Sequence, residues 1–272
     1  MRPLRTIPVL PTMFTLGNLV CGFFSIVVAA NLGRPEDAIL SSAETTHLVI
    51  SGWLIFLAMI FDALDGQVAR LSNTTSDFGA QLDSLCDLVT FGVAPAFLFV
   101  KMCPLAEVDH SRRVWIIAAT FVACAAMRLA RFNVETSDDT EDHMYFSGLP
   151  SPAAAASIAG FAIMFYTLRK PDNALPYATT IDTALQTILP FFAAFVAIAM
   201  VTRVPYPHVV NQVLNGQRSF GHVVGVLFSL VAIMVIKGYA VPIICCSFVF
   251  YGPVRFVWAK IMHHRQREES LF

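Results

Sequence analysis

The residues of this chain that could do chemistry are four aspartates at helical spacing beside long apolar stretches: Asp62, Asp65, Asp83 and Asp87. The first two are three residues apart and the last two are four apart, so each pair would share one face of a helix. Carboxylates at the edge of a hydrocarbon layer are costly and therefore indicate a function. About four negative charges on adjoining helices would be neutralised by about two divalent cations, and hard oxygen ligands favour Mg²⁺, Mn²⁺ or Ca²⁺.

Glycines and an arginine accompany the aspartates on the same helix faces. Gly66 and Arg70 continue the first face in four-residue steps from Asp62, and Gly79 begins the second face. A glycine there would let a flat nucleotide approach the backbone, although small residues also allow membrane helices to pack closely. Arg70 could meet a phosphate, or its side chain could simply reach out to the membrane surface.

The whole pattern resembles the signature of the CDP-alcohol phosphotransferase family at every fixed position: Asp62-x2-Asp65-Gly66-x2-Ala69-Arg70-x8-Gly79-x3-Asp83-x3-Asp87. Enzymes of this family transfer a phosphatidyl-type group from a CDP-linked lipid to an alcohol and release CMP. The resemblance implies two metal sites, one held by Asp62, Asp65 and Asp83 and the other held or bordered by Asp62, Asp83 and Asp87. It also implies that Asp87 is the catalytic general base, which takes the proton from the attacking hydroxyl.

The resemblance further implies a set of residues that contact the CDP-lipid: Asp62, Gly66, Ala69, Arg70, Ser76, Gly79, Asp83 and Thr15. Ser76 has a second interpretation, because Ser76 or Asp77 could cap the helix that follows. The chain departs from the family at Thr12, where the opening Pro-Asn-x-x-Thr commonly has asparagine, but it retains Thr15.

Other stretches resemble one branch of the family, the bacterial-type CDP-diacylglycerol–serine phosphatidyltransferases: Leu10 to Gly22, Ser84 to Ala96, Arg128 to Asn133 and Gly148 to Ala155. This resemblance implies CDP-diacylglycerol and L-serine as substrates, phosphatidylserine and CMP as products, and a homodimer in the membrane. Inositol, inositol phosphate, glycerol phosphate and choline remain alternative acceptors. The acidic segment 134–147 favours an uncharged or zwitterionic acceptor over a phosphorylated one.

Serine carries a carboxylate, which needs a cationic or dipolar partner. Arg128 and Arg131 would lie at the cytoplasmic end of one span, and Ser151 with Pro152 would begin the next helix, whose amino terminus attracts anions. We therefore expect Arg128, Arg131 and Ser151 to bind serine or a lipid phosphate. Anchoring by cytoplasmic positive charge would also explain the arginines, and Gly148–Pro152 could be a purely structural turn.

Membrane helices must position these residues. Of the 272 residues, 56% are hydrophobic and only 14% are charged, which is a membrane composition. We expect an all-α, polytopic bundle that forms a single domain over residues 1–272. A span needs roughly 20 mainly apolar residues. About eight are expected: 11–31, 47–65, 79–101, 113–132, 152–169, 184–202, 220–237 and 239–260.

Other classes of protein fit the sequence less well. The net charge of −1 gives no sign of nucleic-acid binding, and the six cysteines lie mostly in apolar runs without metal-ligand spacing, as core residues do. The first apolar run is long and is followed by further spans, so we expect it to be retained and not cleaved as a signal peptide. A cation-coupled transporter commonly has acidic residues in both halves, whereas here every intramembrane carboxylate lies between Asp62 and Asp87.

The distribution of basic residues predicts the orientation. If the amino terminus is cytoplasmic, eleven of the 18 Lys and Arg residues fall on the cytoplasmic side. The aspartates then lie at the cytoplasmic ends of the second and third spans. We expect a multi-pass protein of the bacterial inner (cytoplasmic) membrane whose active site faces the cytoplasm.

Overall fold

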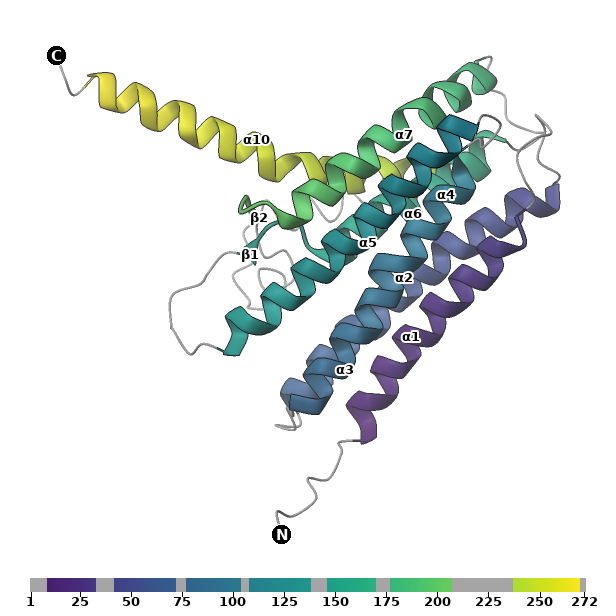
Figure 1. Ribbon diagram of the computed structural model, residues 1–272, viewed down its shortest axis with the longest axis horizontal. Coiled ribbons are helices and arrows are strands. Elements are labelled where there is room, and N and C mark those ends of the chain that lie inside the picture. Colours follow the sequence, from purple (N-terminus) through teal and green to yellow (C-terminus); the bar gives the residue numbers. More distant parts are fainter. Residues whose placement is uncertain are drawn as a thin grey trace, which may run out of the picture.

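The computed structural model is a bundle of long helices (Figure 1). It describes residues 9–32, 42–71, 77–103, 108–137, 146–169, 177–206 and 237–269. The α-helices are α1 (Val9–Ala30), α2 (Ser42–Leu71), α3 (Asp77–Asp87), α4 (Ala94–Met102), α5 (Val108–Ser137), α6 (Ser151–Leu168), α7 (Ala178–Val201) and α10 (Ala240–Glu269). A π-helical segment, η1 (Leu88–Val93), joins α3 to α4, and a 3₁₀ turn, η2 (Lys237–Tyr239), precedes α10.

Seven stretches of helix in the described part of the chain are long and apolar enough to cross a membrane. One of them, Phe78–Met102, is built from α3, η1 and α4 together, and the others correspond to α1, α2, α5, α6, α7 and α10. The expectation of an all-α, polytopic membrane bundle is confirmed. The expected span at 220–237 lies outside the described residues except for Lys237, which begins η2.

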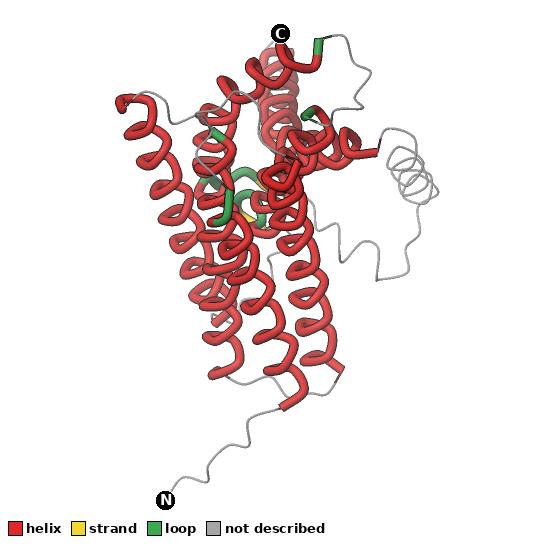
Figure 2. Tube along the Cα trace, turned by 90° about the vertical axis from the view of Figure 1, so that its right-hand side faces the viewer, coloured by secondary structure: helices red, strands yellow, loops and turns green. Residues whose placement is uncertain are grey.

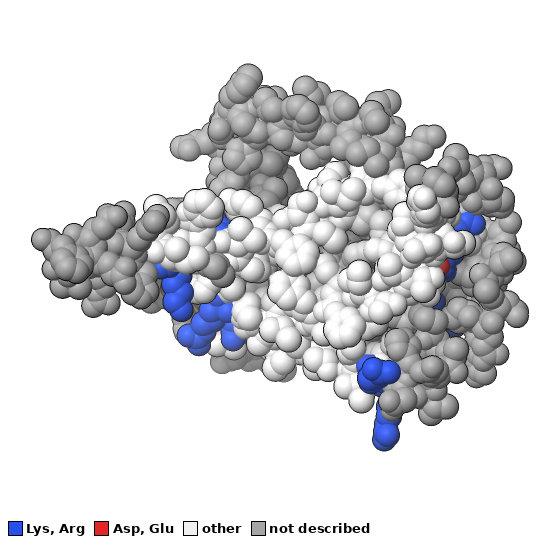
Figure 3. Space-filling model, turned by 90° about the horizontal axis from the view of Figure 1, so that it is seen from above, with Lys and Arg blue, Asp and Glu red and all other residues white. Residues whose placement is uncertain are grey.

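The outer surface of the bundle suits a lipid environment. Many large apolar side chains are exposed on the long helices, among them Phe23, Trp53, Ile116, Phe191 and Trp258. Figure 2 shows most of the long helices running side by side. In Figure 3 the visible face is largely uncharged, with Lys and Arg gathered toward its ends. Such a belt can remain exposed because lipid tails cover it.

Helix α6 lies at the centre of the bundle, and small residues let its neighbours approach closely. Most of its side chains are fully buried, and many of them are alanines. A Cβ placed on Gly52 of α2 would lie 3.0 Å from the carbonyl oxygen of Ala159. On the other side, Gly160 packs directly against Pro242 of α10. Close backbone approach of this kind stabilises helix pairs in membranes, where there is no hydrophobic drive between them.

A short antiparallel ribbon fixes the point at which α6 begins. Strand β1 (Phe146–Ser147) pairs with β2 (Pro205–Tyr206). The amide of Gly148 then donates to the carbonyl of Val204 at 3.0 Å, and the amide of Leu149 donates to that of Ala199 at 3.0 Å. The carboxyl end of α7 therefore holds the amino terminus of α6 in place.

Gly148 is required by the conformation of this turn. Its φ is +97°, in the left-handed region that costs other residues roughly 1–2 kcal/mol. A Cβ there would also lie 2.5 Å from the carbonyl oxygen of Met200. Both the backbone conformation and the lack of space exclude a side chain.

We predict that Gly148→Ala lowers the free energy of unfolding by at least about 2 kcal/mol, because the backbone strain adds to the collision with Met200. Thermal unfolding of the purified protein in detergent measures the loss. Gly17→Ala is the matched control, since the nearest atom to its new Cβ is a ring carbon of Phe61 at 3.2 Å. Equal stability of Gly148→Ala and the unmodified protein would contradict this account of the turn.

Candidate metal centre

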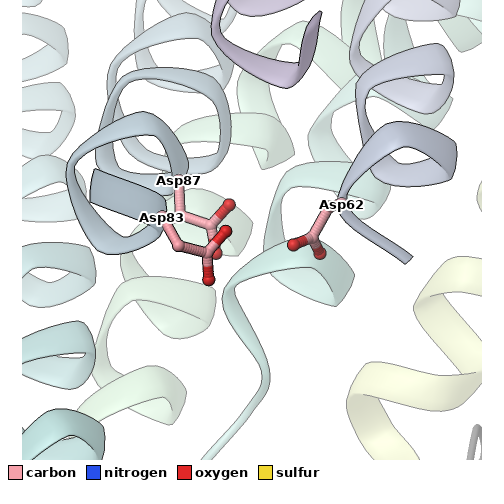
Figure 4. Close-up of side chains that lie close together, drawn as sticks. All are labelled: Asp62, Asp83 and Asp87. Carbon is pink, nitrogen blue, oxygen red and sulfur yellow. The ribbon is translucent and has the colours of Figure 1, made fainter. Parts of the chain in front are cut away.

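Three of the signature aspartates converge from two helices. Asp62 lies on α2, whereas Asp83 and Asp87 lie one turn apart on α3. One carboxylate oxygen from each lies within 4.8 Å of the others, and Figure 4 shows the three side chains pointing toward one another. The spacing in the sequence therefore does bring these carboxylates to one place.

The donor set fits a hard divalent cation. In an octahedral site with bonds of about 2.1 Å, ligand oxygens are separated by at most about 4.2 Å. Small side-chain adjustments would bring Asp62, Asp83 and Asp87 within that limit. Carboxylate oxygens suit Mg²⁺ or Mn²⁺ and not the soft metals that prefer thiolates. The three side chains could therefore bind a divalent metal ion.

Asp65 is in a different environment from the other three. Its side chain is buried and accepts a hydrogen bond from the hydroxyl of Thr15 on α1. The set of converging carboxylates in the described residues does not include it. Its role as a metal ligand stays a prediction, and its contact with Thr15 ties the amino-terminal half of α1 to the aspartate-bearing end of α2.

One face of α1 carries a buried strip that begins beside the aspartates. Thr15, Asn18, Gly22 and Ser25 recur at steps of three and four residues, so they share one face of the helix, and all four are buried. We call this set the α1 polar strip. Only Thr15 of this set was predicted as a site residue, although the helical period of the set could have indicated Asn18 as well.

Asn18 connects the α1 polar strip to Asp87. Its side chain is fully buried, and its Nδ2 donates to Oδ1 of Asp87 at 2.9 Å. Its backbone carbonyl accepts a hydrogen bond from the hydroxyl of Thr90 at 3.2 Å. A Cβ on Gly22 would collide with Thr90. The backbone of α1 at Gly22 therefore lies in direct contact with Thr90 of η1.

The π-helical segment begins directly after Asp87. Thr90, Phe91 and Gly92 within it are buried. Single turns of π-helix inside longer helices are frequent at functional sites. Here the wider turn places Thr90 against α1 while α3 keeps Asp83 and Asp87 on a regular helical face.

The two predicted acceptor-binding arginines make different contacts. Nη1 of Arg128 donates to the hydroxyl of Ser151 at 2.8 Å, and the charge of Arg128 interacts with that of Asp87. Arg131 instead donates to the carbonyl of Val201 at the carboxyl end of α7, at 3.3 Å. The structure thus brings Arg128 and Ser151 to the site as a pair and directs Arg131 toward α7.

A second link joins the aspartate helix to α5. The hydroxyl of Ser84 accepts from Nδ2 of Asn133 at 2.9 Å and also donates to the carbonyl of Ala80 at 3.1 Å. Asn133 was not among the predicted site residues. Its contact holds α5, and with it Arg128, close to α3.

Several predicted contacts with the CDP-lipid involve residues whose surroundings are only partly described. Gly66 lies on α2 and Gly79 on α3, as expected. Ala69 and Arg70 belong to α2, but their side chains lie outside the described part of the chain, as does all of Ser76. Their roles stay predictions.

Comparison with known proteins agrees with the geometry. Residues 8–199 match the model of the CDP-alcohol phosphatidyltransferase family. A CDP-diacylglycerol–serine O-phosphatidyltransferase of Helicobacter pylori is 29% identical, over 97% of this chain and 99% of its own length. Enzymes of the same name from Methanocaldococcus jannaschii and Saccharomyces cerevisiae are 33% and 38% identical, over 75% and 57% of this chain and 83% and 53% of their own lengths.

We predict opposite effects of Asp83→Asn on stability without and with a divalent metal. Without metal, the change relieves repulsion among the carboxylates, so the variant unfolds at the same temperature as the unmodified protein or a higher one. With Mn²⁺ at about 100 times its Kd, the unmodified protein gains about 2.7 kcal/mol, and the variant gains much less. Thermal unfolding across a Mn²⁺ titration measures both effects.

Asp182→Asn is the control for this titration. Asp182 forms an ion pair with Arg169 (2.9 Å) where the carboxyl end of α6 meets the amino-terminal part of α7, at the end of the bundle opposite the aspartate cluster. Its loss should leave the stabilisation by Mn²⁺ intact. Equal stabilisation of Asp83→Asn and Asp182→Asn by Mn²⁺ would contradict a metal site at the three aspartates.

Proposed function

This chain belongs to the CDP-alcohol phosphatidyltransferase family, and from this premise we propose that it transfers the phosphatidyl group of CDP-diacylglycerol to L-serine. The products are phosphatidylserine and CMP. The observation that carries the proposal is the convergence of Asp62, Asp83 and Asp87 at one end of a membrane bundle. The serine acceptor is supported by the similar proteins, which are CDP-diacylglycerol–serine O-phosphatidyltransferases.

We also propose which residues bind the metal and how many ions they hold. Asp62, Asp83 and Asp87, joined by Asp65, would hold Mg²⁺ or Mn²⁺, most simply as two ions. Bound there, the ions would supply positive charge against the pyrophosphate as negative charge develops on the departing CMP. The aspartates hold the positive charge of the ions at a fixed place beside the lipid interface.

Asp87 acts as the general base in the transfer. The hydroxyl oxygen of serine attacks the phosphorus that carries the diacylglycerol, and its proton passes to the carboxylate of Asp87. The bond from that phosphorus to the oxygen of CMP breaks, and CMP leaves with the electron pair. A base must lie within hydrogen-bond reach of the proton it takes, and the contact with Asn18 fixes the direction in which Asp87 points.

The nucleotide and its diphosphate lie along the signature helices. Gly66 and Gly79 leave room for the cytidine, while Ala69, Arg70 and Ser76 contact the CDP group. Thr15 donates a hydrogen bond to Asp65. It therefore fixes that carboxylate and also borders the CDP-lipid. These assignments follow from the family signature.

Arg128 and Ser151 bind the carboxylate of serine. Ser151 begins α6, where free backbone amides and the helix dipole favour an anion, and Arg128 reaches this point from α5. The guanidinium already contacts the hydroxyl of Ser151 and retains further donors, since arginine carries five N–H groups. Arg131 supports the same region through the end of α7.

We further propose the setting in which the reaction occurs. The whole chain is one membrane-embedded domain that forms a homodimer in the bacterial inner membrane. The aspartates face the cytoplasm, where serine and CMP exchange with solution. The excess of basic residues on that side supports this orientation.

We predict that purified protein releases CMP from CDP-diacylglycerol when Mg²⁺ or Mn²⁺ and L-serine are both present. Asp87→Asn should lower kcat by about 10²–10⁴-fold or more, because a positioned general base usually contributes that factor to the rate. Asp182→Asn should leave release unchanged. CMP release with inositol or glycerol phosphate, but not with serine, would overturn the proposed acceptor and leave the family unaffected.

We predict that Arg128→Lys raises the KM for serine by at least about tenfold, because lysine keeps the charge but loses the planar fork. The KM for CDP-diacylglycerol should change little. Arg131→Lys is the parallel variant, and comparison of the two shows which arginine serves the acceptor. An unchanged serine KM in Arg128→Lys would remove Arg128 from the acceptor site.

A further inference from the structure

Asn18 has a polar atom without a partner beside the proposed base. Among the described side chains, only two buried polar atoms lack a hydrogen bond: Oδ1 of Asn18 and Nε of Arg128. Asn18 donates to Asp87, and the charge of Arg128 interacts with the same carboxylate. The proposed base therefore has an unsatisfied acceptor beside it on α1 and an unsatisfied donor near it on α5.

The orientation of the Asn18 amide is fixed by chemistry. An ionised carboxylate only accepts hydrogen bonds, so Nδ2 must face Asp87 and Oδ1 must face away from that oxygen. The backbone of Asn18 is held by Thr90, and its side chain is fully enclosed. The free carbonyl oxygen is therefore a built feature of the site, and buried polar groups of this kind ordinarily have a partner.

Another member of the α1 polar strip shows how such a group is satisfied when it only joins helices. The hydroxyls of Ser25 and Ser51 lie 2.8 Å apart, and each also reaches the other residue's carbonyl oxygen at 3.0 Å. Both hydroxyl groups therefore have hydrogen-bond partners within the helix pair. Asn18, seven residues before Ser25 on the same face and next to Asp87, leaves an acceptor open.

A protonated amine is the donor that suits this acceptor. An ammonium group carries three N–H donors and a positive charge, and the field of the nearby aspartates favours a cation. An amino acid would then match the site at each end: its ammonium meets Oδ1 of Asn18, its carboxylate meets Nε of Arg128, and its hydroxyl lies at Asp87.

We propose that Asn18 determines the specificity for an amino-acid acceptor. Its Oδ1 accepts a hydrogen bond from the α-ammonium group of L-serine, while its Nδ2 donates to Asp87. This inference rests on the proposed function. It separates serine from inositol and glycerol phosphate, which have no amine, and from choline, whose quaternary ammonium has no N–H to donate.

The test compares L-serine with 3-hydroxypropionate, which is serine without its ammonium group. The ratio of their kcat/KM values is measured in the unmodified protein and in Asn18→Ala; where turnover of 3-hydroxypropionate is too slow, its inhibition constant against serine replaces it. A hydrogen bond to a charged group corresponds to a preference of about 10- to 100-fold. Asn18→Ala should reduce the preference for serine by about that factor, and such a cycle isolates the interaction between residue and ammonium.

Two variants sharpen the comparison. Asn18→Asp keeps an acceptor but cannot donate to Asp87, so it should lower kcat and retain the preference for serine over 3-hydroxypropionate. Ser25→Ala removes a buried hydroxyl from the same helix face away from the aspartates, and it should leave the preference unchanged. If Asn18→Ala does not fold, Asn18→Leu, which has nearly the same shape, takes its place.

The outcomes are distinct. If Asn18→Ala slows both acceptors equally, Asn18 only positions Asp87, and the proposal is wrong. If the ratio is unchanged while the Mn²⁺ concentration for half-maximal activity rises, Oδ1 belongs to the metal, and the proposal is wrong as well. Failure of the proposed function would look different, because the unmodified protein would then release no CMP in response to serine.

Discussion

Mutual repulsion of carboxylates is the constraint on which the rest of this structure depends. Asp62, Asp83 and Asp87 bring oxygens within 4.8 Å of one another at the edge of an apolar bundle. At an effective dielectric constant of about 20, two unit charges at that separation repel by several kcal/mol. The fold must hold the three side chains together against this repulsion, and a bound cation converts it into attraction. The cluster is therefore a site whose stability and function depend on the same ion.

The surrounding helices supply that restraint from three sides. Helix α1 holds Asp65 through Thr15 and Asp87 through Asn18. Helix α5 is linked to α3 through Asn133 and Ser84, which brings Arg128 to the start of α6. The ribbon β1–β2 and the turn at Gly148 fix that start. Residues far apart in the sequence thus form one polar end of the bundle.

The sequence predicted what depends on local spacing. Apolar runs of about 20 residues gave the spans, and steps of three and four residues placed the aspartates on common helix faces. The π-helical turn at 88–93 was not predictable, because Leu88 to Val93 differs in no clear way from an α-helical stretch. The different directions of Arg128 and Arg131 arise from tertiary contacts with Ser151 and Val201. The contact of Asn18 with Asp87 joins residues 69 positions apart, which no local pattern encodes.

The most direct test of this account is the anomalous diffraction of Mn²⁺ in crystals of the protein. The account predicts a manganese peak within coordination distance, about 2.2 Å, of carboxylate oxygens from Asp62, Asp83 and Asp87. A peak bound elsewhere, with these three side chains turned away from one another, would contradict it.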